Sequence, residues 1–64
     1  MNVQLPDSSV RKILKEPCTI DELLTGLGIN PLEVLVSVNG RVAPEDTLVT
    51  NNDTIRIIRI AHGG

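Results

Sequence analysis

A short helix with well-marked ends is the feature that most restricts how this chain can fold. It begins at Thr19-Ile20-Asp21-Glu22, a capping box in which the Thr19 hydroxyl and the Glu22 carboxylate each accept from the other residue's backbone N–H. Gly28 stands where helices commonly end in a left-handed residue, and Ile29 can then contact Leu24. One apolar face follows the i, i+3, i+4, i+7 spacing through Ile20, Leu23, Leu24 and Leu27. At roughly nine residues the helix is too short to be stable alone, so it must pack on other elements.

The segments on both sides of this helix have the patterns of β-strands. Apolar and polar residues alternate near the N-terminus, and Asn39-Gly40 is a strong hairpin signal between two further apolar runs. The last run holds four isoleucines. We expect strands over residues 1–5, 10–15, 32–38, 41–43 and 54–60, and we expect Leu48 and Val49 to close the bottom of the core. The fold class is therefore α+β, a mixed four- to five-stranded sheet packed on one helix, with the first and last strands adjacent.

Composition limits the chain to one small domain. It has 64 residues without Phe, Tyr or Trp, so the core must come from 22 Ile, Leu and Val residues. We expect a single domain over residues 1–64 whose tail, residues 61–64, is flexible because it offers almost nothing to pack. A net charge of −2, with no basic run and no aromatic residue for stacking, argues against nucleic-acid binding. No segment is long and apolar enough to span a membrane, so we expect a soluble cytoplasmic protein with no membrane contact.

No internal catalytic constellation is visible, and we do not expect an enzyme. Cys18 and His62 are too few ligands for a zinc site, and a single cysteine excludes an internal disulfide. Cys18 could carry sulfur as a thiol, but its place before the capping box favours a structural role, packed against Leu23 as a hydrophobic staple. His62 could hold the tail in a partner's groove or act beside the terminal carboxylate; a solvated histidine is the simpler interpretation.

The last strand and the residues after it combine an exposed surface with a narrow tail. Ile55 and Ile57 fall on one face, and Ile58 and Ile60 fall on the other. Because the helix covers one side of the sheet, the second pair should form an exposed apolar patch flanked by Arg56 and Arg59, with Leu35 on the same outer face. Scattered surface isoleucines are the alternative. The terminal Gly63-Gly64 has no Cβ and could enter a tight channel in another protein; a frayed terminus is the alternative.

Taken in order, these elements resemble the ubiquitin-like β-grasp sulfur carriers. The resemblance is strongest to the thiamine-pathway carriers (ThiS) and their archaeal small-modifier relatives, followed by the small subunit of molybdopterin synthase (MoaD). It covers residues 19–64 well and the N-terminal hairpin poorly. The matching positions are Thr19, Glu22, Leu23, Leu24, Val36, Val38, Asn39, Val42, Asp53, Ile55, Ile57, Gly63 and Gly64.

This resemblance implies chemistry at Gly64. An E1-like adenylyltransferase of the ThiF or MoeB kind would adenylate its carboxylate with ATP and magnesium, which this chain does not itself bind. A sulfur donor such as a cysteine desulfurase or a rhodanese would then convert it into a thiocarboxylate. An acceptor synthase would use the sulfur for a thiazole, a pterin or a tRNA base. Alternatively, lysines of target proteins would attack Gly64, making the chain a ubiquitin-like modifier; a third possibility is a β-grasp interaction domain with an inert Gly-Gly.

The sites expected on this basis are of two kinds. Gly64, preceded by Gly63, supplies the reacting group. The surface that contacts the partner comprises Leu35, Arg56, Ile58, Arg59, Ile60 and His62.

Overall fold

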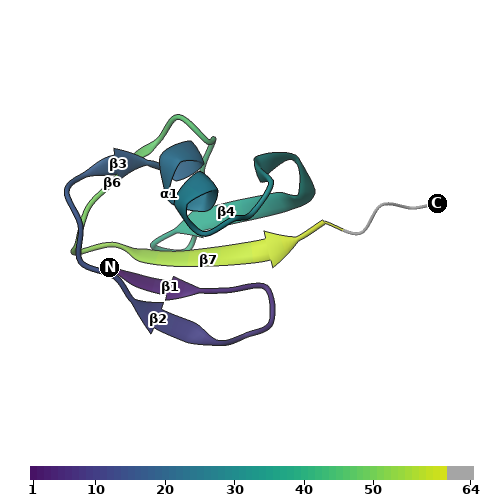
Figure 1. Ribbon diagram of the computed structural model, residues 1–64, viewed down its shortest axis with the longest axis horizontal. Helices are drawn as coiled ribbons and strands as arrows, with labels where there is room; N and C mark the ends of the chain where they lie inside the picture. The colour runs from purple at the N-terminus through teal and green to yellow at the C-terminus, as the bar shows by residue number, and fades with distance from the viewer. Residues whose placement is uncertain (61–64) are drawn as a thin grey trace.

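The computed structural model describes residues 1–60, and in them one α-helix and one 3-10 helix accompany seven short strands (Figure 1). Their order is β1 (Asn2–Gln4), β2 (Val10–Lys12), β3 (Cys18–Thr19), α1 (Ile20–Gly26), η1 (Pro31–Glu33), β4 (Val34–Val38), β5 (Arg41–Val42), β6 (Leu48–Val49) and β7 (Thr54–Arg59). The predicted helix and five of these strands are confirmed, while η1 and the pair β3–β6 were not predicted. The tail, including His62, Gly63 and Gly64, lies outside the described residues.

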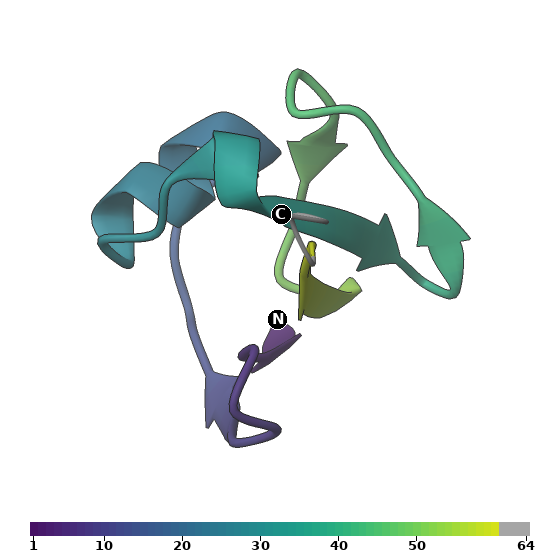
Figure 2. The same cartoon turned by 90° about the vertical axis from the view of Figure 1, so that its right-hand side faces the viewer.

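Five strands form one mixed sheet in the order β2-β1-β7-β4-β5. The strand β7 lies at its centre, parallel to β1 and antiparallel to β4. The first and last strands are therefore adjacent, as predicted. Helix α1 crosses one face of this sheet, and Figure 2 shows that the opposite face carries no helix. No helix within residues 1–60 is long and apolar enough to cross a membrane.

Helix α1 has the ends that the sequence predicts. The Glu22 N–H donates to Thr19 Oγ1 over 3.2 Å, and the Thr19 N–H donates to Glu22 Oε1 over 3.1 Å, which completes the capping box. At the other end, the Ile29 N–H donates to the Leu24 carbonyl over 2.9 Å, with Gly28 at φ +74°. This is a Schellman ending, and it turns the chain back over the sheet toward η1.

The core lies between α1 and the sheet. It consists of Met1, Val3, Cys18, Ile20, Leu23, Leu24, Val34, Val36, Val49, Ile55 and Ile57. Leu27, predicted on the same helix face, is only partly buried at its edge. Cys18 and Leu23 are both buried, which supports the structural interpretation of this cysteine.

Two strand predictions and one core prediction differ from the structure. The second strand ends at Lys12 rather than at residue 15, because its ladder with β1 closes where the Ile13 N–H donates to the Met1 carbonyl. Residues 32 and 33 belong to η1, because the Asn30 side chain accepts from the Leu32 N–H and Pro31 opens the turn. Leu48 is 61% exposed while Val49 is fully buried, since pairing with β3 sends these neighbours to opposite sides.

The start of β7 is fixed by two polar side chains. Asn39, at φ 52° in the hairpin turn before Gly40, donates from Nδ2 to Asp53 Oδ1 and accepts from the Thr54 N–H, each over 2.9 Å. Asp53 also accepts from the Thr50 N–H over 2.8 Å. Side-chain hydrogen bonds of Asn39 and Asp53 thus connect the β4–β5 turn to the loop before β7.

Acid is expected to weaken the fold through three carboxylates. Hydrogen bonds from the Thr50 N–H and Asn39 lower the pKa of Asp53, those from Thr19 lower the pKa of Glu22, and those from Ser9 lower the pKa of Asp7. A lowered folded-state pKa stabilises the fold above the ordinary values, 3.8 for Asp and 4.5 for Glu. This contribution is lost as the pH falls through those values toward the lower folded ones.

Urea denaturation at a series of pH values measures this loss. Asp53→Asn should reduce the dependence on pH, and Glu16→Gln, at an exposed loop carboxylate, should change it little. An unfolding free energy that stays constant from neutral pH to well below these values would contradict the assignment.

Candidate functional site

The central strand β7 presents a different surface on each side of the sheet. Ile55 and Ile57 are 0% and 2% exposed and face α1, whereas Ile58 is 39% exposed and faces away. Strand alternation places Arg56 on the same side as Ile58. The side of the sheet opposite α1, here called the outer face, therefore carries both an isoleucine and a guanidinium at its centre.

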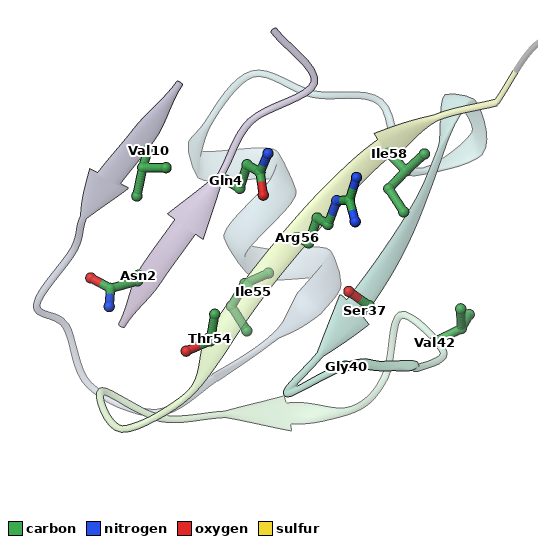
Figure 3. A pocket seen from close by; sticks show the side chains of 10 residues that line it. All are labelled: Asn2, Gln4, Val10, Ser37, Gly40, Val42, Thr54, Ile55, Arg56 and Ile58. Atoms are coloured by element: carbon green, nitrogen blue, oxygen red, sulfur yellow. The ribbon is translucent and has the colours of Figure 1, made fainter. Parts of the chain in front are cut away.

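The strand register assembles the outer face into rows. Val10, Gln4, Arg56, Ser37 and Val42 are paired in succession across all five strands. Beside this row, Leu35 lies opposite Ile58, and its side chain is 47% exposed. Lys12, Asn2 and Thr54 form the row on the other side of Arg56. Figure 3 shows side chains of these rows on the strands, with α1 behind the sheet.

A shallow hollow of about 430 Å³ lies on this face. Its lining includes Val10, Gln4, Arg56, Ser37 and Val42, together with Ile58 (Figure 3). Exposed apolar side chains at both ends of the row and a cation in its middle suit contact with another macromolecule better than enclosure of a small ligand.

Arg59 does not flank this patch, contrary to the prediction. It follows Ile58 by one residue, so strand alternation sends it to the side of α1. There Arg59 Nη1 lies 3.7 Å from Glu33 Oε2, and both side chains are largely exposed. It also borders a second hollow of about 250 Å³, with Leu5, Leu27 and Ile29 in the lining. The two arginines expected to act together are thus on opposite faces.

Ile60, expected in the exposed patch, is half-buried and lies just after the end of β7. Its N–H donates to the Glu33 carbonyl over 2.9 Å. Glu33 therefore contacts the end of β7 twice, through this carbonyl and through its carboxylate on Arg59. This role of Glu33 was not predicted, because the sequence pattern indicated a strand over residues 32–38 rather than the turn η1.

The remaining predicted residues do not form a second site within residues 1–60. The Cys18 thiol is 5% exposed in the core. No group of three or more His, Cys, Asp or Glu that could hold a metal ion is found in the described part of the chain. His62, Gly63 and Gly64 lie outside it.

Comparison with known proteins decides the family. Residues 3–61 match the family model of small archaeal modifier protein 2. The chain belongs to this family. No curated protein sequence matches the chain.

Solved structures share the fold of this chain. A crystal structure of the thiamine biosynthesis protein ThiS from Geobacter metallireducens aligns over 100% of both chains, with a TM-score of 0.70 and 24% identity. A solution structure of a thiamine biosynthesis protein from the same organism has a TM-score of 0.63 and 26% identity, over 100% of this chain and 88% of the other. The predicted ubiquitin-like β-grasp fold is thereby confirmed.

The two faces of β7 can be tested with a matched pair of variants. Ile58→Asp should lower the free energy of unfolding by less than about 1 kcal/mol, because the side chain is exposed. Ile57→Asp should unfold the domain, because it buries an unpaired carboxylate in the core. Chemical denaturation followed by circular dichroism measures both. Similar losses for the two variants would show that Ile58 also belongs to the core.

Proposed function

We propose that this protein is a carrier whose Gly64 carboxylate is adenylated by an E1-like enzyme and then receives sulfur as a thiocarboxylate. The chain is the substrate of that enzyme and not itself a catalyst. The observation that carries the proposal is the pair Gly63-Gly64, which is separated by three residues from the end of the central strand of the sheet. Because the activating step consumes ATP, we place the protein in the cytoplasm.

Adenylation is needed because a carboxylate is a poor acyl donor. A Gly64 carboxylate oxygen would attack the α-phosphorus of ATP, and pyrophosphate would leave. A persulfide on the sulfur donor would then attack the carbonyl carbon of the acyl-adenylate and expel AMP. A thiol would cleave the resulting acyl disulfide, which releases the thiocarboxylate and leaves a disulfide between that thiol and the donor cysteine. The sulfur would remain on Gly64, from which an acceptor enzyme could take it. ATP and magnesium belong to the activating enzyme in this scheme.

The fold supports such a reaction because the outer face, which would bind the partner, is separate from the Gly64 carboxylate, which would react. The Ile60 N–H bond to Glu33 holds the end of β7, and the four residues beyond it can span at most about 14 Å. A partner that binds the outer face would therefore find the reacting carboxylate within about 14 Å of Ile60. Narrow glycines at the end of this reach would enter a confined ATP site more easily than residues with a Cβ.

Conjugation to proteins is the second candidate function. The family description names a modifier, and the acyl-adenylate would react with a lysine amine as well as with sulfur. The structural similarity to a thiamine biosynthesis protein at 26% identity favours the carrier instead. Both functions require the same activation and differ only in the group that attacks Gly64.

The mass of the protein recovered from its native cell separates these two functions. Exchange of one oxygen for sulfur on the C-terminal peptide is expected for the carrier. Branched lysine peptides that end in Gly63-Gly64 would show the modifier. The proposal fails if neither the sulfur-containing C-terminal peptide nor branched lysine peptides are found, even after sulfur metabolism has been stimulated.

A further inference from the structure

Basic and acidic residues of this protein lie in different kinds of secondary-structure element. Five of the six basic residues lie in strands of the main sheet, namely Arg11, Lys12, Arg41, Arg56 and Arg59. None of the eight acidic residues does: Asp7, Glu16, Asp21, Glu22, Glu33, Glu45, Asp46 and Asp53 all lie in turns, in loops or in the two helices. The sheet is thus basic, although the whole chain has a net charge of −2.

The outer face receives only positive charge from its strands. Alternation and register place Lys12 and Arg56 on it, while Arg41 lies opposite Val38 and belongs to the side of α1. Within residues 1–60, the one ion pair is that between Arg59 and Glu33, so no carboxylate neutralises Arg56. Its cross-strand neighbours are the uncharged Gln4 and Ser37.

The surroundings of Arg56 make it a suitable anchor for a carboxylate. Its row ends in exposed valines, Val10 and Val42 (Figure 3). The next row adds Ile58 and Leu35, which lie opposite each other and are also exposed. A partner that covers these apolar side chains also removes water from the guanidinium. An arginine can then bind a carboxylate through two parallel hydrogen bonds, and arginine is enriched among the residues that dominate interface energies.

Self-association through this face is disfavoured by the same charge. A two-fold dimer contacts itself with the same patch on both subunits. An axis through the centre of the outer face would bring two Arg56 guanidinium groups together with no acidic residue of either sheet to separate them. The occupant must therefore supply the negative charge itself.

We propose that the outer face docks a partner protein surface that presents a carboxylate to Arg56 and apolar side chains to Ile58 and Leu35. The inference rests on the proposed function in taking the adenylating enzyme as this partner. It adds the chemistry of recognition: an apolar, acidic surface on the enzyme and a single central arginine on the carrier. Complementary charge of this kind fixes the orientation of the docked carrier and makes association dependent on salt.

The test uses the full chain and each purified E1-like adenylating enzyme of the same organism, with binding measured by calorimetry. Arg56→Glu is expected to weaken binding by about tenfold or more, and Arg56→Gln by less. The matched control is Arg41→Glu, which reverses the same charge in an exposed residue of the same sheet but on the opposite side. It should change the dissociation constant by less than about twofold.

Two further readouts separate docking from a general loss of structure. Thermal unfolding should show all three variants folded, since both arginines are exposed. High ionic strength should weaken binding of the parent more than binding of Arg56→Gln. Exchange of pyrophosphate at saturating carrier should be unchanged in Arg56→Gln, because the variant raises KM and leaves kcat alone.

The results distinguish failure of this inference from failure of the proposed function. If the parent binds and Arg56→Glu binds as well as the parent, or Arg41→Glu is weakened equally, the docking inference is wrong and the carrier function stands. If the parent neither binds nor supports exchange with any of these enzymes, both are wrong.

Discussion

Leu24→Ala is expected to unfold a large fraction of the protein. Leu24 is 1% exposed and belongs to the core cluster between α1 and the sheet. Truncating a buried leucine removes apolar contacts and leaves a cavity, at a cost of about 2 to 5 kcal/mol. A typical stability of 0.05 to 0.15 kcal/mol per residue gives a domain of this size only about 3 to 10 kcal/mol in total. The substitution therefore removes a large part of the available stability.

Thr25→Ala is the matched control, since it alters the next residue of the same helix at an exposed position. Urea denaturation should show a small change for Thr25→Ala and a large loss for Leu24→Ala. If the two variants unfold at similar urea concentrations, the helix does not pack on the sheet through the face assigned to it.

Deletion of Gly64 is expected to abolish adenylation while leaving the fold and the docking of the carrier nearly unchanged. The reacting carboxylate and the α-phosphorus must come within about 3 to 3.5 Å for an efficient attack. Removing one residue shifts the carboxylate by up to about 3.5 Å, which is the length of one extended residue. The core and the outer face are complete within residues 1–60, so stability and binding should not depend on Gly64.

Gly63→Val tests the width of the channel separately from the reach of the tail. The variant keeps the length of the chain but adds a β-branched side chain and restricts the backbone. We expect slower exchange of pyrophosphate with a nearly unchanged dissociation constant. Normal exchange by Gly63→Val would show that the enzyme's ATP site does not need a narrow tail.

Local signals in the sequence were enough to predict the helix and the sheet's main strands. Thr19, Glu22 and Gly28 act within a few residues of one another, so their hydrogen bonds follow from the sequence alone. The same holds for Asn39-Gly40, whose positive φ values set the β4–β5 hairpin. The pairing of β3 with β6 joins Cys18 to Val49 through only two residues on each side. So short a non-local contact leaves no periodic pattern to recognise.

The sequence was enough to assign single residues of the candidate site to a face of the sheet, but not to predict which of them lie side by side. Ile58 and Leu35 could be assigned to the outer face from strand alternation, and the register places them opposite each other. The row that joins Val10 to Val42 through Arg56 depends on four pairings at once. The β1–β2 and β4–β5 hairpins are local, whereas the two pairings of β7, with β1 and with β4, are not. Arg59 was assigned to the wrong face because its position next to Ile58 was given more weight than the two-residue period.

The measurement that tests the account most directly is ATP–pyrophosphate exchange by the purified E1-like enzymes of the same organism, with the intact chain as substrate. We predict exchange that requires the chain, saturates with its concentration and is lost on deletion of Gly64. Exchange that persists after this deletion, or no exchange with any of the enzymes, would contradict activation of Gly64 and would leave a β-grasp interaction domain with an inert Gly-Gly.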